Sequence, residues 1–164
     1  MKAATMDSES QLRYPLLGSF KLDGFRCILN DGAARTKSLK PIRNSFIQRE
    51  LSDLWYAGLD GETVVGSPCD GQTLNRTQSG VASSFGEPDF QVYVFDHITR
   101  PTDPYHKRYT RCFAHMAHPR ITVLEQTTIL NQTDLWKFEE KALRLGYEGI
   151  MVRSVDGPYK YGRA

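Results

Sequence analysis

Lys21 has neighbours that could make a lysine chemically active, because the carboxylate of Asp23 follows two residues on and the guanidinium of Arg26 follows five residues on. A free lysine ammonium has a pKa near ~10.4, so roughly one side chain in a thousand is a neutral amine around pH ~7.5. Burial or a neighbouring cation can lower that pKa and yield an amine nucleophile. The alternative is a solvated lysine at a strand edge, paired with Asp23. The short pattern by itself favours that alternative.

Further candidate residues are acidic or aromatic and lie on predicted strands. Asp60 and Glu62 are two residues apart on one strand, so their side chains point to the same side. They either face solvent or line a polar site. Phe95 lies near the end of an apolar strand, where it is either a core residue or an aromatic face held in a fixed position. Glu148 directly precedes the apolar run of the last predicted strand.

The densest basic stretch of the chain follows Arg35 and contains Lys37, Lys40 and Arg43. Such a stretch can be a solvated loop, or it can contact the phosphates of a nucleic acid. The composition alone favours neither interpretation.

The elements that must position these residues alternate between strands and helices, without a βαβ repeat or a phosphate-binding loop. Apolar alternation predicts two strands within residues 14–29, joined by a tight Asp-Gly turn, and Asn30-Asp31-Gly32 predicts a hairpin. Asn44 is expected to cap a helix that runs to about Tyr56, with Leu54 and Trp55 on its apolar face. Further strands are predicted over residues 59–66, 90–96, 121–130 and 147–153, and further helices over residues 73–84, 105–117 and 133–145. This order predicts an α+β fold with mostly antiparallel sheets.

The composition is that of an ordinary globular domain: 164 residues, 24% charged, 40% hydrophobic and a net charge of +2. The three cysteines, Cys27, Cys69 and Cys112, have neither a disulfide framework nor a zinc-binding spacing. An intracellular, reducing and cytoplasmic location is therefore expected. No apolar run approaches ~18 residues and no signal-peptide pattern is present, so we expect no membrane association.

Taken in order, these segments resemble motifs of the ATP-dependent DNA ligases, within the lysine-nucleotidyltransferase superfamily, and particularly those of the small viral and phage enzymes. The resembling segments are Lys21-Leu22-Asp23-Gly24-Phe25-Arg26 for the motif Lys-x-Asp-Gly-x-Arg, Arg35-Thr36-Lys37, Asp60-Gly61-Glu62, Val94-Phe95-Asp96, Glu148-Gly149-Ile150-Met151-Val152-Arg153 and Gly157-Pro158-Tyr159-Lys160-Tyr161-Gly162-Arg163. The resemblance spans residues 14–163. It implies an adenylation domain with two mainly antiparallel sheets and flanking helices around a nucleotide cleft.

The resemblance also implies a chemistry. Lys21 would attack the α-phosphorus of ATP to form lysyl-AMP and release pyrophosphate. AMP would then pass to a DNA 5′-phosphate, and the nick would be sealed. Phe95 would stack on adenine and Glu62 would accept hydrogen bonds from the ribose. Arg26 and Arg35 would bind phosphate or ribose.

Mg²⁺ and DNA are the other implied ligands. Glu148 is the expected carboxylate near a magnesium ion that neutralises the phosphates, and Asp60 is a supporting or metal-proximal acid. The implied contacts to a nicked duplex come from Lys37, Lys40, Arg43 and Arg163.

The chain departs from the family pattern at its C-terminal end, because the Lys-x-Lys motif and the OB-fold domain expected further along are missing. Residues 1–164 are therefore expected to be a truncated adenylation domain, weakly active or inactive alone, and a monomer. Alternative functions are an RNA ligase, a messenger-RNA capping guanylyltransferase or a catalytically inactive nucleic-acid-binding module.

Overall fold

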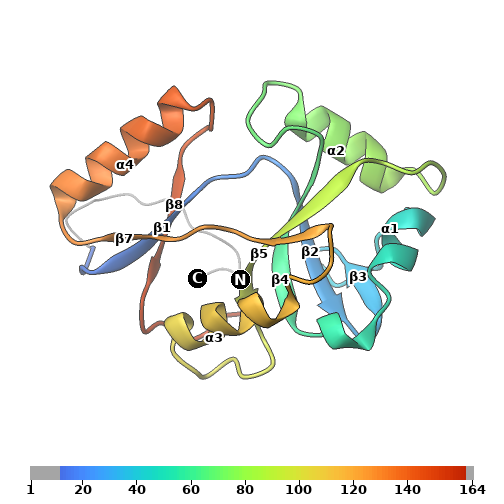
Figure 1. Cartoon of the computed structure of the whole chain (residues 1–164), viewed down its shortest axis with the longest axis horizontal. Helices are drawn as coiled ribbons and strands as arrows, with labels where there is room; N and C mark the ends of the chain where they lie inside the picture. The colour runs from blue at the N-terminus through green and yellow to red at the C-terminus, as the bar shows by residue number, and fades with distance from the viewer. Residues whose placement is uncertain (1–11, 162–164) are drawn as a thin grey trace.

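The computed structural model describes residues 12–161, which form two β-sheets placed side by side (Figure 1). The three-stranded sheet has the order β7-β1-β8, and the five-stranded sheet has the order β3-β2-β4-β5-β6. The strands are β1 (Leu16–Phe20), β2 (Phe25–Asn30), β3 (Ala33–Arg35), β4 (Leu59–Val65), β5 (Phe90–His97), β6 (Ile121–Val123), β7 (Thr127–Ile129) and β8 (Ile150–Ser154). All pairs are antiparallel except β5 with β6. The predicted α+β class with mainly antiparallel sheets is confirmed.

The chain crosses from one sheet to the other between β1 and β2, which makes the predicted tight turn at Asp23-Gly24 wrong. β1 pairs with β7 and β8, whereas β2 pairs with β3 and β4. A Cβ atom at Gly24 would lie 2.3 Å from the backbone oxygen of Thr63 in β4. Glycine is therefore required here by a close backbone approach rather than by a hairpin. Lys21 lies on this crossing segment.

The Asn30-Asp31-Gly32 hairpin is confirmed, and it joins β2 to β3. Asp31 and Gly32 have φ angles of 51° and 71°, as a two-residue hairpin turn with a right-handed strand twist requires. Asn44 then caps α1 (Ser45–Glu50) through a hydrogen bond from Ile47 N to Asn44 Oδ1.

The helix predicted to run to Tyr56 is shorter, and a separate 3₁₀ turn follows it at η2 (Leu54–Tyr56). The side chain of Asp53 accepts a hydrogen bond from Trp55 N and starts this new turn. Because the helical register is broken, Leu54 and Trp55 are 70% and 63% exposed rather than part of a core face.

Residues 121–130 form two short strands instead of the single predicted strand. β6 extends the five-stranded sheet beside β5, and β7 begins four residues after the end of β6 and joins the other sheet beside β1. The chain therefore crosses between the sheets a second time, as the orange strand in Figure 1 shows.

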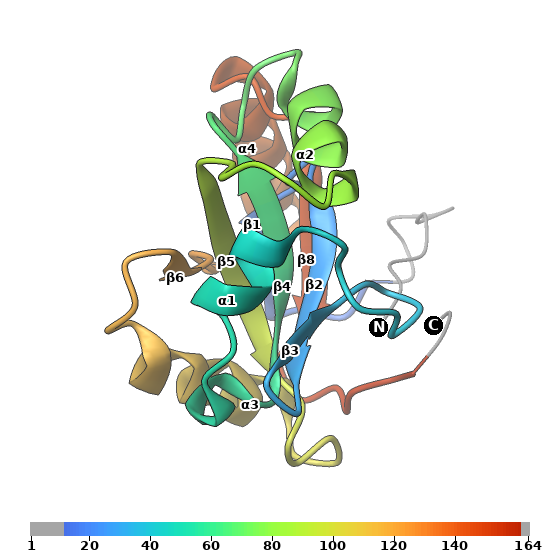
Figure 2. The same cartoon turned by 90° about the vertical axis from the view of Figure 1, so that its right-hand side faces the viewer.

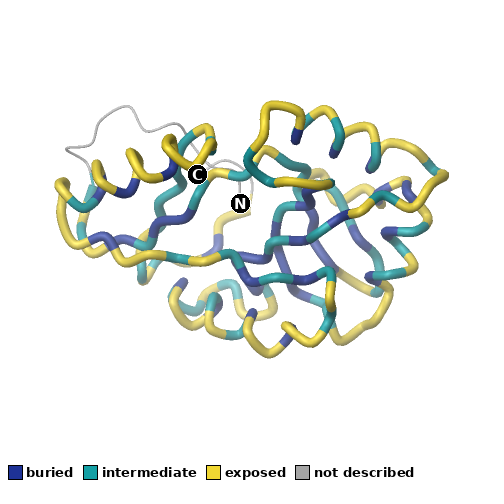
Figure 3. Tube along the Cα trace, turned by 45° about the horizontal axis from the view of Figure 1, so that its top comes forward, coloured by how far each residue is buried: buried dark blue, intermediate teal, exposed yellow. Residues whose placement is uncertain are grey.

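Helices pack against both sheets, and Figure 2 shows α1 and α2 in front of the five-stranded sheet. α2 and α1 lie on the five-stranded sheet, α4 lies on the three-stranded sheet, and α3 packs against β5. Their bounds are α2 (Thr73–Ala82), α3 (Tyr105–Cys112) with the 3₁₀ turn η3 (Phe113–His115), and α4 (Gln132–Arg144). Each sheet has its own apolar cluster, and the buried positions concentrate in the strands (Figure 3). None of the helices within residues 12–161 has the length and apolar character needed to cross a bilayer.

Candidate functional site

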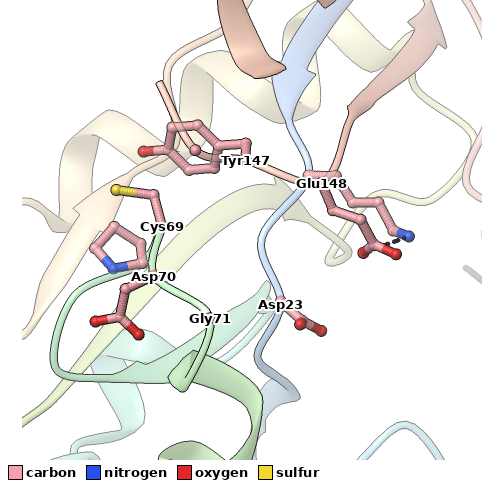
Figure 4. Close-up of a pocket in the computed structure, with 9 residues that line it drawn as sticks. Asp23, Cys69, Asp70, Gly71, Tyr147 and Glu148 are labelled. Carbon is pink, nitrogen blue, oxygen red and sulfur yellow. Dashed lines mark hydrogen bonds and ion pairs between the residues drawn. The ribbon is translucent and has the colours of Figure 1, made fainter. Parts of the chain in front are cut away.

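Lys21 lies directly after β1, and its ammonium faces the carboxylate of Glu148. The Nζ–Oε2 distance is 3.0 Å, and the two side chains are 46% and 62% exposed (Figure 4). The backbone N–H of Lys21 also donates to the carbonyl of Gly149 at 2.9 Å, which holds the end of β1 against the segment leading into β8. The lysine is thus fixed at its backbone, open to solvent at its tip, and paired with Glu148 rather than with Asp23.

A small pocket of about 170 Å³ opens beside Lys21. It is lined by the crossing segment, the β4–α2 loop and the α4–β8 loop: Lys21, Asp23, Pro68, Cys69, Asp70, Gly71, Gly146, Tyr147 and Glu148 (Figure 4). The two loops approach closely, since a Cβ atom at Gly146 would lie 2.7 Å from the carbonyl oxygen of Cys69. Pockets for drug-sized ligands are usually ~300–1,000 Å³, so this one accommodates only part of a nucleotide. Sequence reasoning missed the β4–α2 loop because it carries none of the motifs.

Arg26 and Asp60 form a bidentate ion pair between neighbouring strands. Both the Nε–Oδ1 and the Nη2–Oδ2 distances are 2.5 Å, and Asp60 is fully buried. Although burial lowers the pKa of Arg26, the hydrogen bond and charge of Asp60 outweigh that effect and raise it above its ordinary value. Asp60 also accepts a hydrogen bond from the hydroxyl of Tyr159 at 2.9 Å. Of the two interpretations open at the sequence level, the structure supports the polar site for Asp60, because this side chain does not face solvent.

Glu62 lies opposite Arg26 in the β2–β4 register and is partly buried. Burial raises the pKa of Glu62 to about 7, and the charges of Asp60 and Asp23 act in the same direction. The charge of Arg26 and a backbone hydrogen bond from Gly24 oppose this rise. The site therefore contains a carboxyl group that titrates near neutral pH.

Phe95 lies at the point where the two sheets meet and is 7% exposed. The guanidinium carbons of Arg26 and Arg153 lie 5.2 Å and 4.6 Å from the centre of its ring. Arg153 comes from β8 and also donates to Ser19 Oγ at 3.4 Å, so it connects the three-stranded sheet to an aromatic ring of the five-stranded sheet. Tyr105 donates to the carbonyl of Phe95 at 2.6 Å and fixes the backbone beneath the ring. Neither arginine contact could be read from sequence spacing.

The predicted DNA-contact residues form a separate group along the β3–α1 segment. Lys37, Lys40 and Arg43 are solvent-exposed. Arg35 is partly buried and donates to the carbonyl of Leu39 at 3.2 Å, so its guanidinium contributes to the shape of this turn. Arg163 lies outside the described residues.

The predicted metal ligands do not meet in one cluster. Within residues 12–161, the structure has no group of three or more His, Cys, Asp or Glu side chains suited to a metal ion. Both oxygens of Asp60 are occupied by hydrogen bonds from Arg26 and Tyr159, which fits the role of a supporting acid better than that of a ligand. Glu148 is exposed, and a magnesium ion held mainly by water and phosphates needs only one or two such carboxylates.

The fold is similar to that of solved ATP-dependent DNA ligases. Two structures of the Chlorella virus DNA ligase-adenylate are 32% and 31% identical to this chain, with TM-scores of 0.81 and 0.84. The matches cover 98% of this chain and 62% and 61% of the viral enzyme. The ATP-dependent DNA ligase of bacteriophage T7, in complex with ATP, shares the fold at 16% identity and a TM-score of 0.62, over 92% of this chain and 60% of that enzyme.

The family follows from the sequence itself. The family described as "ATP dependent DNA ligase domain" matches residues 11–164, so this chain belongs to the ATP-dependent DNA ligase domain family. A comparison with curated protein sequences gave no match. The chain spans about three fifths of the length of the Chlorella virus ligase that it resembles.

Proposed function

We propose that this chain is the adenylation domain of an ATP-dependent DNA ligase, with Lys21 as its nucleophile. The observation that carries the proposal is the Lys21–Glu148 pair, 3.0 Å apart on an exposed edge between the two sheets. The neutral amine of Lys21 would form a bond to the α-phosphorus of ATP, while the bond from that phosphorus to the bridging oxygen breaks and pyrophosphate leaves. The amine must first lose a proton, and Glu148 is the acceptor nearest to it.

The second sheet supplies the groups that would hold the nucleotide. Phosphoryl transfer depends mainly on positioning and charge neutralisation, and Arg26 is a rigidly held cation for that purpose. Phe95 would present a ring face to adenine after Arg153 shifts, and Glu62 would accept hydrogen bonds from ribose hydroxyls. Asp60 holds Arg26 in place. The role of Arg35 toward the nucleotide remains a prediction.

Magnesium would bind next to Glu148 together with the phosphates of ATP. When bound, the ion would neutralise negative charge on the α-phosphate and the leaving pyrophosphate. The exposed Glu148 carboxylate is compatible with this role, and we assign the metal no other ligand among residues 12–161.

Transfer of AMP to a DNA 5′-phosphate and sealing of a nicked duplex are the later steps that we propose for the whole protein, acting as a monomer. The exposed cations of the β3–α1 segment would contact the phosphate backbone: Lys37, Lys40 and Arg43, joined by Arg163. A cytoplasmic location is proposed from the free state of the cysteines.

Intact-protein mass spectrometry tests the proposal. Because residues 1–164 alone are expected to be weakly active or inactive, the whole ligase that contains this domain is incubated with ATP and magnesium, and we expect a mass increase of one AMP that GTP does not give. Lys21→Ala should abolish the increase, whereas Lys107→Ala, a change at an exposed lysine on α3, should retain it. An unmodified wild-type ligase, or an AMP adduct that persists in Lys21→Ala, would contradict the assignment.

A further inference from the structure

The segment that follows β8 leaves the three-stranded sheet and packs against the other sheet through α3. The carbonyl of Val155 accepts a hydrogen bond from His106 N at 2.9 Å, and Gly157 O accepts one from Arg108 Nη1 at 2.8 Å. Tyr159 N then donates to the carbonyl of Pro101 at 2.8 Å. These three bonds place the Tyr159 side chain next to β4.

Arg108 makes this docking firm. Its side chain is 1% exposed and contacts the carboxylate of Asp96 with both Nε and Nη2, at 2.9 Å and 3.3 Å. The remaining nitrogen, Nη1, donates to the carbonyls of Asp103 and Gly157. A buried guanidinium satisfied in this way is costly to disturb, so the segment is held in one position.

The hydroxyl of Tyr159 reaches the buried ion pair of the nucleotide site. It donates to Asp60 Oδ2 at 2.9 Å, and the same oxygen accepts from Arg26 Nη2. The ring is 7% exposed, and burial together with the charge of Asp60 raises the pKa of Tyr159 above its ordinary value. The phenol therefore keeps its proton and remains a donor to the carboxylate.

We propose that Tyr159 is a positioning residue for Arg26. A carboxylate that accepts two guanidinium bonds can still rotate about its own axis, and a third donor from a fixed direction removes that freedom. The plane of the Asp60 carboxylate sets the plane of the Arg26 guanidinium, which lies over Phe95, and Arg26 pairs with Glu62 in the β2–β4 register. Through Asp60, Tyr159 thus orients the Arg26 guanidinium, which would bind the nucleotide. This inference depends on the proposed function for its role, but its geometry can be tested without a nucleotide.

Tyr159→Phe separates this role from packing. Phenylalanine keeps the edge-on contact with the ring of Tyr161, at 5.0 Å between centroids, and the contact with the Arg108 guanidinium at 5.8 Å. The backbone bond to Pro101 is also retained, so the change removes the hydroxyl alone. Tyr109→Phe is the matched control, because the Tyr109 hydroxyl donates to a backbone carbonyl, that of Leu124, at 2.9 Å.

The first measurement is the ¹⁵N–¹H NMR signal of the Arg26 Nε–H group, assigned by its loss in Arg26→Lys. In the wild-type chain this proton is held by Asp60 Oδ1, so we expect a resolved, slowly exchanging signal. Tyr159→Phe should shift the signal and accelerate its exchange, whereas Tyr109→Phe should leave it unchanged. An unchanged Arg26 signal in Tyr159→Phe would overturn the positioning role.

The second measurement is the affinity for ATP, by titration calorimetry, in two backgrounds. Tyr159→Phe should weaken binding about tenfold in the wild-type background, as the loss of one hydrogen bond to a charged group implies. In the Arg26→Lys background, Tyr159→Phe should change the affinity for ATP less than about twofold, because lysine has no bidentate guanidinium for Asp60 to orient. Equal losses in both backgrounds would refute coupling through Arg26. A wild-type chain that does not bind ATP would refute the proposed function, and the NMR result would then decide on the geometry alone.

Discussion

Glu62→Gln gives the sharpest prediction from the structure, because its stabilising effect should grow as the pH rises from ~5 to ~8. The folded-state pKa of Glu62, about 7, lies above the ordinary value of 4.5 because the carboxyl is buried. The folded state therefore binds more protons than the unfolded state between these two pH values, and stability falls as pH rises through this window. Glutamine in the same place carries no such titration.

The magnitude follows from the pKa difference. A shift of this size corresponds to about 3 kcal/mol of destabilisation when Glu62 is fully ionised, at about 1.36 kcal/mol per pKa unit. At pH ~5 Glu62 is already largely ionised in the unfolded state, so part of the destabilisation of the wild type is present there. The difference in the free energy of unfolding between Glu62→Gln and the wild type should therefore grow by about 2 kcal/mol from pH ~5 to pH ~8. For a chain of this length, this corresponds to a relative gain of about 4–8 °C in Tm.

The assay is thermal unfolding, followed by circular dichroism at both pH values, with Glu87→Gln as the control. Glu87 is an exposed carboxylate paired with Arg49, so its replacement should give no pH-dependent difference. The buried histidines, such as His97, titrate identically in variant and wild type and cancel in the comparison. A Tm difference for Glu62→Gln that is the same at both pH values would refute the burial argument.

Two other substitutions test the β1–β2 crossing and the proposed stacking residue. Gly24→Ala should destabilise the fold by about 2–3 kcal/mol in denaturant unfolding, because the added Cβ meets the backbone oxygen of Thr63 at 2.3 Å. Gly149→Ala is the control, because its Cβ points into open space and should leave the free energy of unfolding nearly unchanged. Equal stability of the two variants would show that the β1–β2 crossing can relax. Phe95→Leu should weaken ATP binding in calorimetry with little change in the affinity for nicked duplex DNA, because it removes the ring face and leaves the exposed cations in place; a loss confined to DNA binding would retire the stacking assignment.

Local sequence patterns were sufficient for most elements and for the order of the motifs. The Asn30-Asp31-Gly32 turn and the Asn44 cap depend on side chains and backbone angles within a few residues, and both are confirmed. The Asp23-Gly24 break has the same local signal as a hairpin, yet it carries the chain between sheets. The distinction lies in the close approach of Gly24 to Thr63, which is 39 residues further along the chain, so no local pattern indicates it.

The same limit separates the site residues that could be predicted from those that could not. Lys21 and Glu148 belong to short motifs, and the structure brings them within 3.0 Å of each other. Arg153 and Tyr159 act through residues far away in sequence, and nothing in their own neighbourhoods indicates Phe95 or Asp60 as partners. The prediction that Leu54 and Trp55 lie on the apolar face of a helix is wrong for a local reason. The side chain of Asp53 caps a new 3₁₀ turn, which breaks the helical register although the apolar periodicity of the sequence continues.

The two halves of the site belong to different sheets, so its geometry depends on the connections between them. Glu148 pairs with Lys21 on the side of the three-stranded sheet, and Arg26 is held against Asp60 within the five-stranded sheet. A single stretch, from Glu148 to Tyr159, supplies the lysine's partner, the Arg153 contact to Phe95 and the hydroxyl on Asp60. A displacement of this stretch would therefore alter both the partner of Lys21, the proposed nucleophile, and Arg26, the cation proposed to bind phosphate. This shared dependence predicts that substitutions which loosen its anchor at Arg108 reduce adenylation more steeply than they reduce the affinity for ATP.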